Sequence, residues 1–156
     1  TLLAADLIVS MPKLKTHHWA GVTLGMKNLF GVVPGVKYGW PKNLLHVNGI
    51  VRSIVELAAT IPVDYTIVDG IEGMEGDGPI VGTPVPSHCL LFGRSVYAVD
   101  WMATQVMGLD PGKLPVFALA SATGFGPLVD PPVVGDSLKT FSRPFILPPQ
   151  FDSLQA

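Results

Sequence analysis

The sequence predicts an α/β domain, a layered domain in which a mostly parallel or mixed sheet is flanked by helices. Two observations support this fold class. Short apolar runs of strand length alternate with longer segments of helical periodicity, and turn-forming residues separate them. The chain has 156 residues, the size of one ordinary domain and enough to bury a core.

Three apolar runs predict buried strands. They are ADLIVS at residues 5–10, YTIVDG at 65–70 and HCLLFG at 88–93. Continuous apolar runs of this length are typical of strands that are covered on both faces. Between the first run and residue 31 the sequence favours a loop that leads into a short helix.

Two segments predict helices. From Leu44 to Thr60 apolar residues recur at helical spacing, and Pro62 follows the end. Residues 95–108 are apolar on nearly every side, which predicts a buried helix that Gly108 ends. Residues 127–150 carry two proline pairs and predict a tail with at most one edge strand. We expect one α/β domain over residues 1–136 and a Pro-rich tail over 137–156.

The composition predicts a partner for part of the surface. Apolar residues make up 48% of the chain and charged residues 14%, whereas soluble domains usually carry ~25% charged residues. We therefore expect a homo-oligomer. The longest uncharged run, residues 114–129, is too short and too interrupted to cross a bilayer, and no secretory signal precedes it. We expect a mature or truncated cytoplasmic protein with neither a nucleic-acid nor a membrane partner.

Cysteine and metal motifs narrow the possible cofactors. The single Cys89 excludes an intrachain disulfide, a Cys-only zinc site and an iron–sulfur cluster ligated by this chain alone. No HExxH, CxxC or EF-hand spacing occurs. A divalent metal held loosely on one or two carboxylates, as Mg²⁺ often is, stays possible, and its ligands are unassigned.

Basic residues dominate the first third of the chain. No Asp or Glu occurs between Leu7 and Val55, whereas Lys and His residues recur there. Lys13 and Lys15 follow a predicted strand, and the carboxyl edge of an open α/β sheet is where ligands bind. Lys42 and His46 flank the start of the predicted helix 44–60, where free N–H groups attract anions. The pattern favours an anionic ligand, with a solvated surface as the alternative.

The histidine pair and the buried acid each leave alternatives open. His17 and His18 are adjacent, so in an extended chain we expect them to point in opposite directions. Asp100 lies on the predicted buried helix, where a carboxylate needs a partner. It is expected either to form a structural ion pair or backbone bond, or to face the ligand site from beneath.

An acidic, glycine-rich loop, IVDGIEGMEGDGPIVG at residues 67–82, follows the second predicted strand. It is neither a P-loop nor a dinucleotide-binding turn, because the required GK[ST] is missing and Pro79 prevents the helix that a dinucleotide site needs. One reading is a tight surface turn with solvated acids. The other is a loop that closes over a ligand, with Asp69, Glu75 and Asp77 handling a metal ion or a proton.

Four blocks in order resemble the domain of unknown function 362 family. They are VSMPKLKTHHWAGVTLGMKNLFGVVPG, YGWPKNLLH, IVDGIEGMEGDGPIVGTP and AVDWMATQVMGLDP. The resemblance implies that this chain is the C-terminal part of a longer family domain, and many members are associated with iron–sulfur clusters. It also implies a distant similarity to nickel-dependent lactate racemase-type proteins, and hence an α/β site built from Lys, His and acidic side chains.

The expected function is the binding of an anionic small molecule, with or without a divalent metal, in a cleft lined by Lys, His and Asp. The alternative is a non-enzymatic accessory or carrier domain for a redox or metal centre held on another chain. The residues assigned to catalysis are Asp69, Lys13, His17 and Glu75. The residues assigned to ligand binding are Lys15, Lys27, Asn28, Lys42, His46, Gly76, Gly78 and Asp100. Because basic and acidic residues are expected to share the cleft, Lys13 or Lys15 is predicted to lie close to Asp69.

Overall fold

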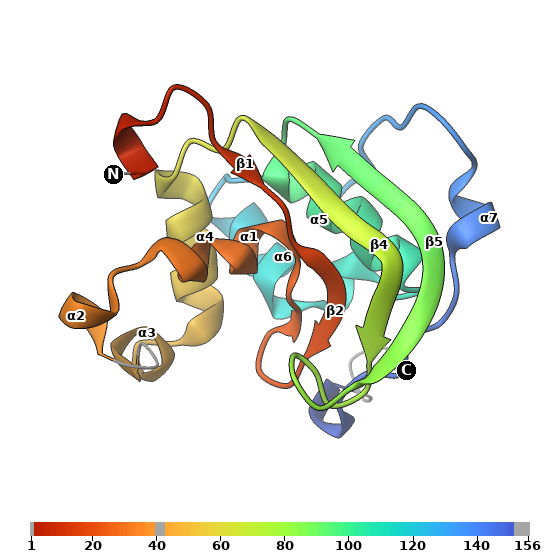
Figure 1. Cartoon of the computed structure of the whole chain (residues 1–156), viewed down its shortest axis with the longest axis horizontal. Coiled ribbons are helices and arrows are strands. Elements are labelled where there is room, and N and C mark those ends of the chain that lie inside the picture. The colour runs from red at the N-terminus through yellow and green to blue at the C-terminus, as the bar shows by residue number, and fades with distance from the viewer. Residues whose placement is uncertain (1, 40–42, 152–156) are drawn as a thin grey trace.

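The computed structural model, in which residues 2–39 and 43–151 are described, has an α/β fold (Figure 1). Its strands form one open mixed sheet, and its helices pack on that sheet, as the sequence predicts. The strands are β1 (Val9–Ser10), β2 (Lys13–His17), β3 (Gly21–Val22), β4 (Tyr65–Glu75) and β5 (Thr83–Gly93). The α-helices are α1 (Leu24–Asn28), α2 (Gly35–Tyr38), α3 (Asn43–Val47), α4 (Ile50–Thr60), α5 (Val96–Val106), α6 (Pro115–Ala122) and α7 (Leu138–Phe141). Short 3-10 turns are η1 (Leu2–Ala4), η2 (Leu29–Val32), η3 (Pro111–Lys113) and η4 (Pro149–Phe151).

Strand β4 is the centre of the sheet. β1 and β2 follow one another along one side of β4 and run parallel to it, with Val9 level with Tyr65 and Lys13 level with Asp69. β5 runs antiparallel along the other side, where it forms a hairpin with β4. β3 is antiparallel to the end of β2. The sheet therefore presents three neighbouring rows of side chains, from β1–β2, β4 and β5.

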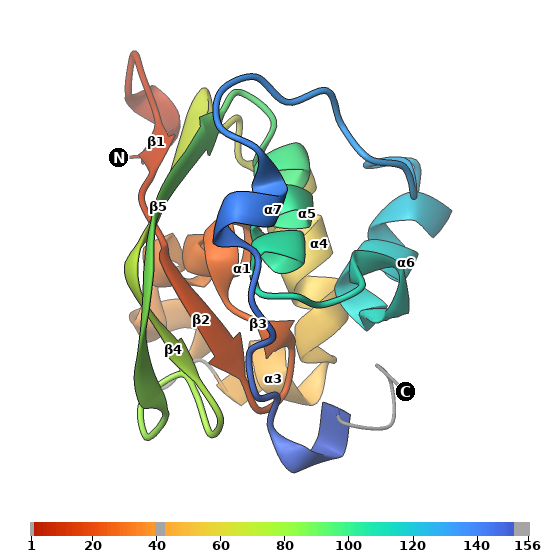
Figure 2. The same ribbon diagram turned by 90° about the vertical axis from the view of Figure 1, so that its right-hand side faces the viewer.

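The helices cover one face of this sheet. Figure 2 shows the strands on one side of the molecule and α4, α5 and α6 on the other. Leu14 and Val68 point from the strands into the core, which also contains Phe117 of α6 and Met107 directly after α5, all fully buried. The opposite face of the sheet carries no helix among the described elements of Figure 2.

The first part of the chain differs from its prediction. The expected buried strand 5–10 is reduced to the two residues of β1, and the expected loop after it contains β2. From Ile8 to Thr16 buried and more exposed side chains alternate. This period of two identifies a strand with one solvent-facing side, which a search for continuous apolar runs misses because that side carries Lys13 and Lys15.

The predicted helix 44–60 is two helices. Gly49 interrupts it with a φ of +97°, a left-handed conformation that a helix cannot contain and that glycine adopts readily. The predicted helix 95–108 is confirmed as α5, with the Ser95 side chain accepting a hydrogen bond from the Ala98 N–H at its start.

The two strands predicted on either side of the glycine-rich loop are longer and less buried than expected. β4 continues to Glu75 and β5 begins at Thr83, so much of the predicted loop is a β-hairpin. The register shifts at Gly70–Glu72, and His88 in the opposite strand has a φ of +50°. This bulge bends the hairpin. Each strand buries only one side, because helices cover only one face.

The C-terminal region packs onto the domain. It contains no strand among residues 127–151, but Phe145, Leu147 and Phe151 belong to the buried core. The segment after α7 is held by backbone bonds from the Arg143 N–H to the Val106 carbonyl and from the Phe145 N–H to the Met107 carbonyl. Helix α6 lies in a region that the sequence analysis did not assign. Over the described residues, none of the helices has the length and apolarity that crossing a membrane requires.

Candidate functional site

The predicted proximity of a lysine to Asp69 is confirmed. Lys13 Nζ lies 2.9 Å from Asp69 Oδ2, and both side chains are partly exposed on the uncovered face of the sheet. Asp69 Oδ1 also accepts a hydrogen bond from the Ile71 N–H at 3.1 Å. The hydrogen bond from Lys13, and then that from Ile71, lower the pKa of Asp69. Asp69 was predicted to lie at the end of a strand. Instead it lies within β4, just before the bulge.

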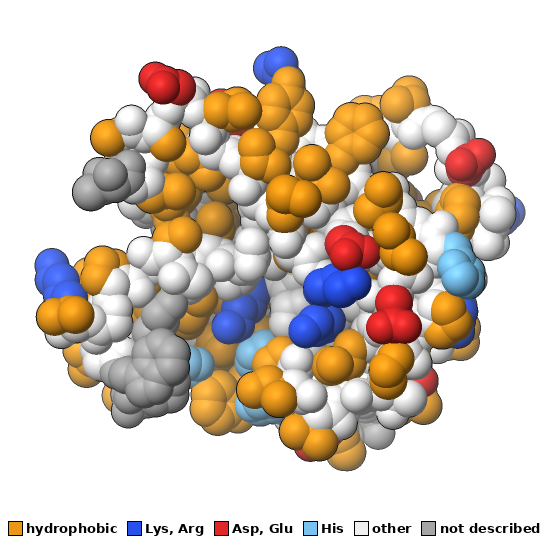
Figure 3. Space-filling model, viewed as in Figure 1, with side chains coloured by type: hydrophobic (Ala, Val, Ile, Leu, Met, Phe, Trp, Pro, Cys, Tyr) orange, Lys and Arg blue, Asp and Glu red, His pale blue; other side chains and the backbone are white. Residues whose placement is uncertain are grey.

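Lys15 and Glu72 extend this charged group along the sheet. Lys15 stands on the same side of β2 as Lys13, and its Nζ lies 3.4 Å from the Pro79 carbonyl. Glu72, which the sequence analysis did not select, is exposed on β4 opposite Pro86. Figure 3 shows basic and acidic side chains next to each other in the middle of this face, with hydrophobic side chains around them. The positive and negative charges on this part of the surface are mixed.

A second group of predicted residues gathers at the end of β2, and we call it the histidine cluster: His17, His18, His46 and Lys27. These residues come from β2 and the turn after it, from α3 and from α1. The His46 ring lies 4.9 Å from Trp19 and 5.9 Å from Phe30, and Lys27 Nζ lies 4.7 Å above the Phe30 ring. Three segments far apart in the sequence therefore place basic side chains around two aromatic rings.

The turn after β2 fixes the tautomer of His17. Its ring is buried, and Nδ1 accepts hydrogen bonds from the Trp19 N–H at 3.0 Å and the Ala20 N–H at 3.3 Å. Because two backbone donors point at Nδ1, that nitrogen carries no proton, and the proton of the neutral ring is on Nε2. The turn therefore keeps His17 neutral and makes Nε2 a donor.

His18 departs from the expectation that the two histidines point apart. The His17 and His18 rings stack with their centroids 4.9 Å apart. The alternation of an extended chain does not apply, because β2 ends at His17 and His18 lies in the turn. His18 Nδ1 lies 2.8 Å from the Gly78 carbonyl, which connects the histidine cluster to the glycine-rich loop.

Burial and neighbouring basic groups set the electrostatics of the histidine cluster. Burial, and then the neighbouring Lys27, His18 and His46, together lower the pKa of His17 from its ordinary value to about 3. His46 was expected to flank the start of one long helix. It lies within the short helix α3 instead, so this expectation was wrong. Lys42 lies outside the described residues.

The pH dependence of stability tests this description of His17. The unfolded chain protonates His17 near pH 6.5, whereas the folded chain does so only near pH 3. As the pH falls below 6.5, the wild type should lose stability relative to His17→Asn, by up to about 1.4 kcal/mol per pH unit. Asparagine cannot be protonated but keeps an acceptor for the two N–H groups.

The measurement is urea unfolding of both proteins at pH 7.5, 6 and 5. Other titrating groups contribute equally to the two proteins and cancel in the difference between them. A difference in unfolding free energy that stays constant over these three pH values would contradict the neutral, buried His17.

The glycine-rich loop is hydrogen-bonded to the end of β2 and the turn after it. Thr16 Oγ1 donates a hydrogen bond to the Gly76 carbonyl at 2.9 Å, and the His18 N–H donates to the Gly78 carbonyl at 3.1 Å. A Cβ on Gly78 would lie 2.3 Å from the Thr16 carbonyl oxygen, which explains the glycine there. Glu75 Oε2 accepts a hydrogen bond from the Ile146 N–H at 2.9 Å. Gly76, Gly78 and Glu75 thus hold the loop and the C-terminal segment in place.

Asp100 and Asn28 make structural bonds. Asp100 is buried, and its two carboxylate oxygens each accept a hydrogen bond at 2.7 Å, from the N–H groups of Gly25 and Met26 at the start of α1. Burial raises the pKa of Asp100 to about 7, and these two bonds act against that rise. Of the two roles expected for Asp100, the backbone bond is the one seen. Asn28 donates to Ser10 Oγ at 3.2 Å, which joins α1 to β1.

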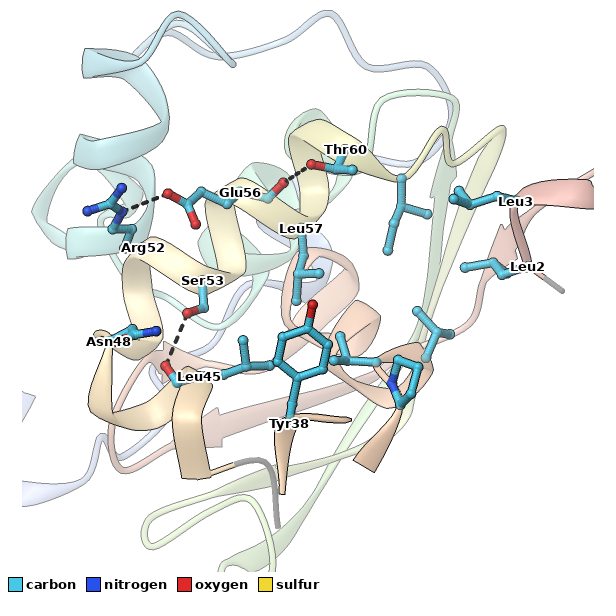
Figure 4. A pocket seen from close by; sticks show the side chains of 14 residues that line it. Leu2, Leu3, Tyr38, Leu45, Asn48, Arg52, Ser53, Glu56, Leu57 and Thr60 are labelled. Carbon is cyan, nitrogen blue, oxygen red and sulfur yellow. Dashed lines mark hydrogen bonds and ion pairs between the residues drawn. The ribbon is translucent and has the colours of Figure 1, made fainter. Parts of the chain in front are cut away.

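Two further features bear on ligands. No group of three or more His, Cys, Asp or Glu side chains within the described ranges could hold a metal ion. A pocket of about 930 Å³ lies beside α4, and the predicted site residues that the structure describes do not line it (Figure 4). Its charged residues Arg52 and Glu56 pair with each other at 2.6 Å.

Several residues around the histidine cluster were missed by the sequence analysis. Thr16, Trp19 and Phe30 hold or surround it, and none carries a charge that would mark it. Trp19 is the one with a usable sequence signal, because it directly follows two histidines.

The comparisons with known proteins show the family of this chain. The family model for a domain of unknown function, DUF362, matches residues 1–105. The thylakoid-associated protein sll1697 of Synechocystis sp. is 37% identical over 125 residues, which is 79% of this chain and 39% of that protein. The chain thus spans about two fifths of the length of this relative. No solved structure matches. The chain belongs to the DUF362 family.

Proposed function

We propose that this chain binds an anionic small molecule, a carboxylate or a phosphate, at the histidine cluster. The observation that carries the proposal is the buried His17, whose Nδ1 accepts two backbone hydrogen bonds and whose protonation the nearby Lys27, His18 and His46 disfavour. An anion held there would be attracted by Lys27 and would accept a hydrogen bond from a histidine N–H.

The supporting geometry comes from three directions. The turn 17–20 presents the two stacked imidazole rings, α1 presents Lys27 and α3 presents His46. Figure 3 shows histidine and basic side chains in a depression beside the sheet. Phe30 and Trp19 supply apolar walls, and the loop 76–79 closes on the same turn through His18. Such a site combines charge with partial exclusion of water, which strengthens its attraction for an anion.

The proposal includes a cytoplasmic location and leaves the reaction open. The Synechocystis relative is described as thylakoid-associated, and that description belongs to the relative. Catalytic roles for Lys13, Asp69 and Glu75 do not follow from the histidine cluster, and a divalent metal is not needed for it.

Thermal unfolding in inorganic phosphate and in acetate tests the proposal. At a ligand concentration of about 100 times Kd, binding stabilises the folded state by about 2.7 kcal/mol, which raises Tm by several degrees. Lys27→Met should lose most of this rise, whereas Lys139→Met, which removes an exposed lysine on α7, should keep it. Sodium chloride at the same ionic strength controls for screening.

A second readout is the His17 ring itself. NMR titration should show its pKa moving upward from about 3 when phosphate binds, because a nearby anion favours the protonated ring. Equal Tm shifts in Lys27→Met and wild type, together with an unmoved His17 pKa, would refute binding at the histidine cluster.

A further inference from the structure

The uncovered face of the sheet carries a band of exposed apolar side chains beside the charged group. In β5 the side chains of Val85 and Cys89 point into the core, and those of Leu90 and Phe92 point outward and are 60% and 78% exposed. On the other side of β4, Met11 is 68% exposed. Parallel strands are normally covered on both faces, and a patch of this kind marks an interaction surface.

We infer that this face binds the same face of a second copy of the chain, so that two sheets pack against each other. We call this uncovered surface of the sheet the outer face. Its residues include Val9, Met11, Lys13, Asp69, Leu90 and Phe92. The inference is independent of the proposed anion site, which lies at the end of β2.

The charge pattern of the outer face is complementary to itself. Lys13 on β2 is level with Asp69 on β4, and Val9 on β1 is level with Tyr65. Met11, midway between Val9 and Lys13, is therefore level with Ile67. A two-fold axis that runs along the strands between β2 and β4 places each copy's β1–β2 over the other copy's β4. Lys13 then faces Asp69 of the other copy, and Met11 faces Ile67.

Other occupants fit this pattern less well. A strongly acidic or basic partner would meet a like charge as well as an opposite one, because Lys13 and Asp69 lie side by side. An anionic lipid surface would attract Lys13 but would meet Asp69 beside it as a like charge. Pairing of two β5 edges is also disfavoured, because Pro84 and Pro86 remove N–H donors from that strand.

Sedimentation and light scattering of the full chain at 1–100 μM give the first test. The wild type should show twice its 16.6 kDa mass. Met11→Glu should weaken self-association at least tenfold, because it places a charge against the apolar Ile67 of the other copy. Val134→Glu, at a residue that is 99% exposed and lies outside the sheet, should leave the dimer intact. A monomeric wild type at 100 μM, or a dimer that Met11→Glu does not affect, would overturn the proposal.

Charge reversal gives the second test and separates assembly from folding. In Lys13→Glu and Asp69→Lys, each homodimer would hold two repulsive contacts between copies, so each variant alone should be largely monomeric. When the two variants are mixed, every contact between copies becomes attractive, while the repulsion within each chain stays. A 1:1 heterodimer should therefore form, and a mixture that stays monomeric would exclude the proposed two-fold arrangement.

Discussion

Replacing Asp100 by alanine is expected to destabilise the fold by about 3–5 kcal/mol. The change removes two 2.7 Å hydrogen bonds and leaves the buried N–H groups of Gly25 and Met26 without acceptors. An unsatisfied buried donor costs about 1–3 kcal/mol, so two such donors cost roughly 2–6 kcal/mol together. Denaturant unfolding monitored by circular dichroism measures the loss.

Asp110→Ala is the matched control. Asp110 accepts a hydrogen bond from the Gly112 N–H at 2.9 Å in an exposed turn, so its loss should cost no more than about 1 kcal/mol. Asp100→Asn keeps one oxygen acceptor but turns an amide group toward the other N–H, and it should fall between wild type and Asp100→Ala. If Asp100→Ala and Asp110→Ala cost the same, the anchoring role of Asp100 is wrong.

Replacing Gly78 by alanine is expected to cost about 2–3 kcal/mol. The new Cβ would lie 2.3 Å from the Thr16 carbonyl oxygen and 2.8 Å from Thr16 Oγ1, so either the loop or β2 must move. Overpacking in a tight site typically costs about 1–3 kcal/mol, and here the obstacle is backbone, which cannot rotate away. The hydrogen bonds from His18 to the Gly78 carbonyl should weaken as the loop shifts.

Gly31→Ala controls for the glycine change itself, because a Cβ at Gly31 meets nothing within 4 Å. It should be neutral or slightly stabilising, since alanine restricts the unfolded chain. Unfolding free energies and the NMR signals of the His18 ring measure both effects. A Gly78→Ala protein as stable as Gly31→Ala, with unchanged His18 signals, would show that the loop is not fastened to β2.

Much of the fold follows from local sequence patterns. The α/β class, helix α5 and a strand beginning at Tyr65 were predicted, because each depends on periodicity or turn residues within about ten positions. The proximity of Lys13 to Asp69 was also predicted, because basic and acidic residues were expected to share one cleft. The predicted function and site remain proposals, and so does the predicted self-association.

The tertiary structure decided the rest. It made a strand of the segment with Lys13 and Lys15, gave Asp100 a structural role and stacked His17 on His18. The reason is that these outcomes depend on partners far away in the chain: Asp100 bonds residues 74 and 75 positions away, and Glu75 bonds Ile146, 71 positions away. Side-chain type alone does not show which backbone donor will lie beside a carboxylate, or which face of a sheet will stay uncovered. Only the packing of the complete domain fixes those neighbours.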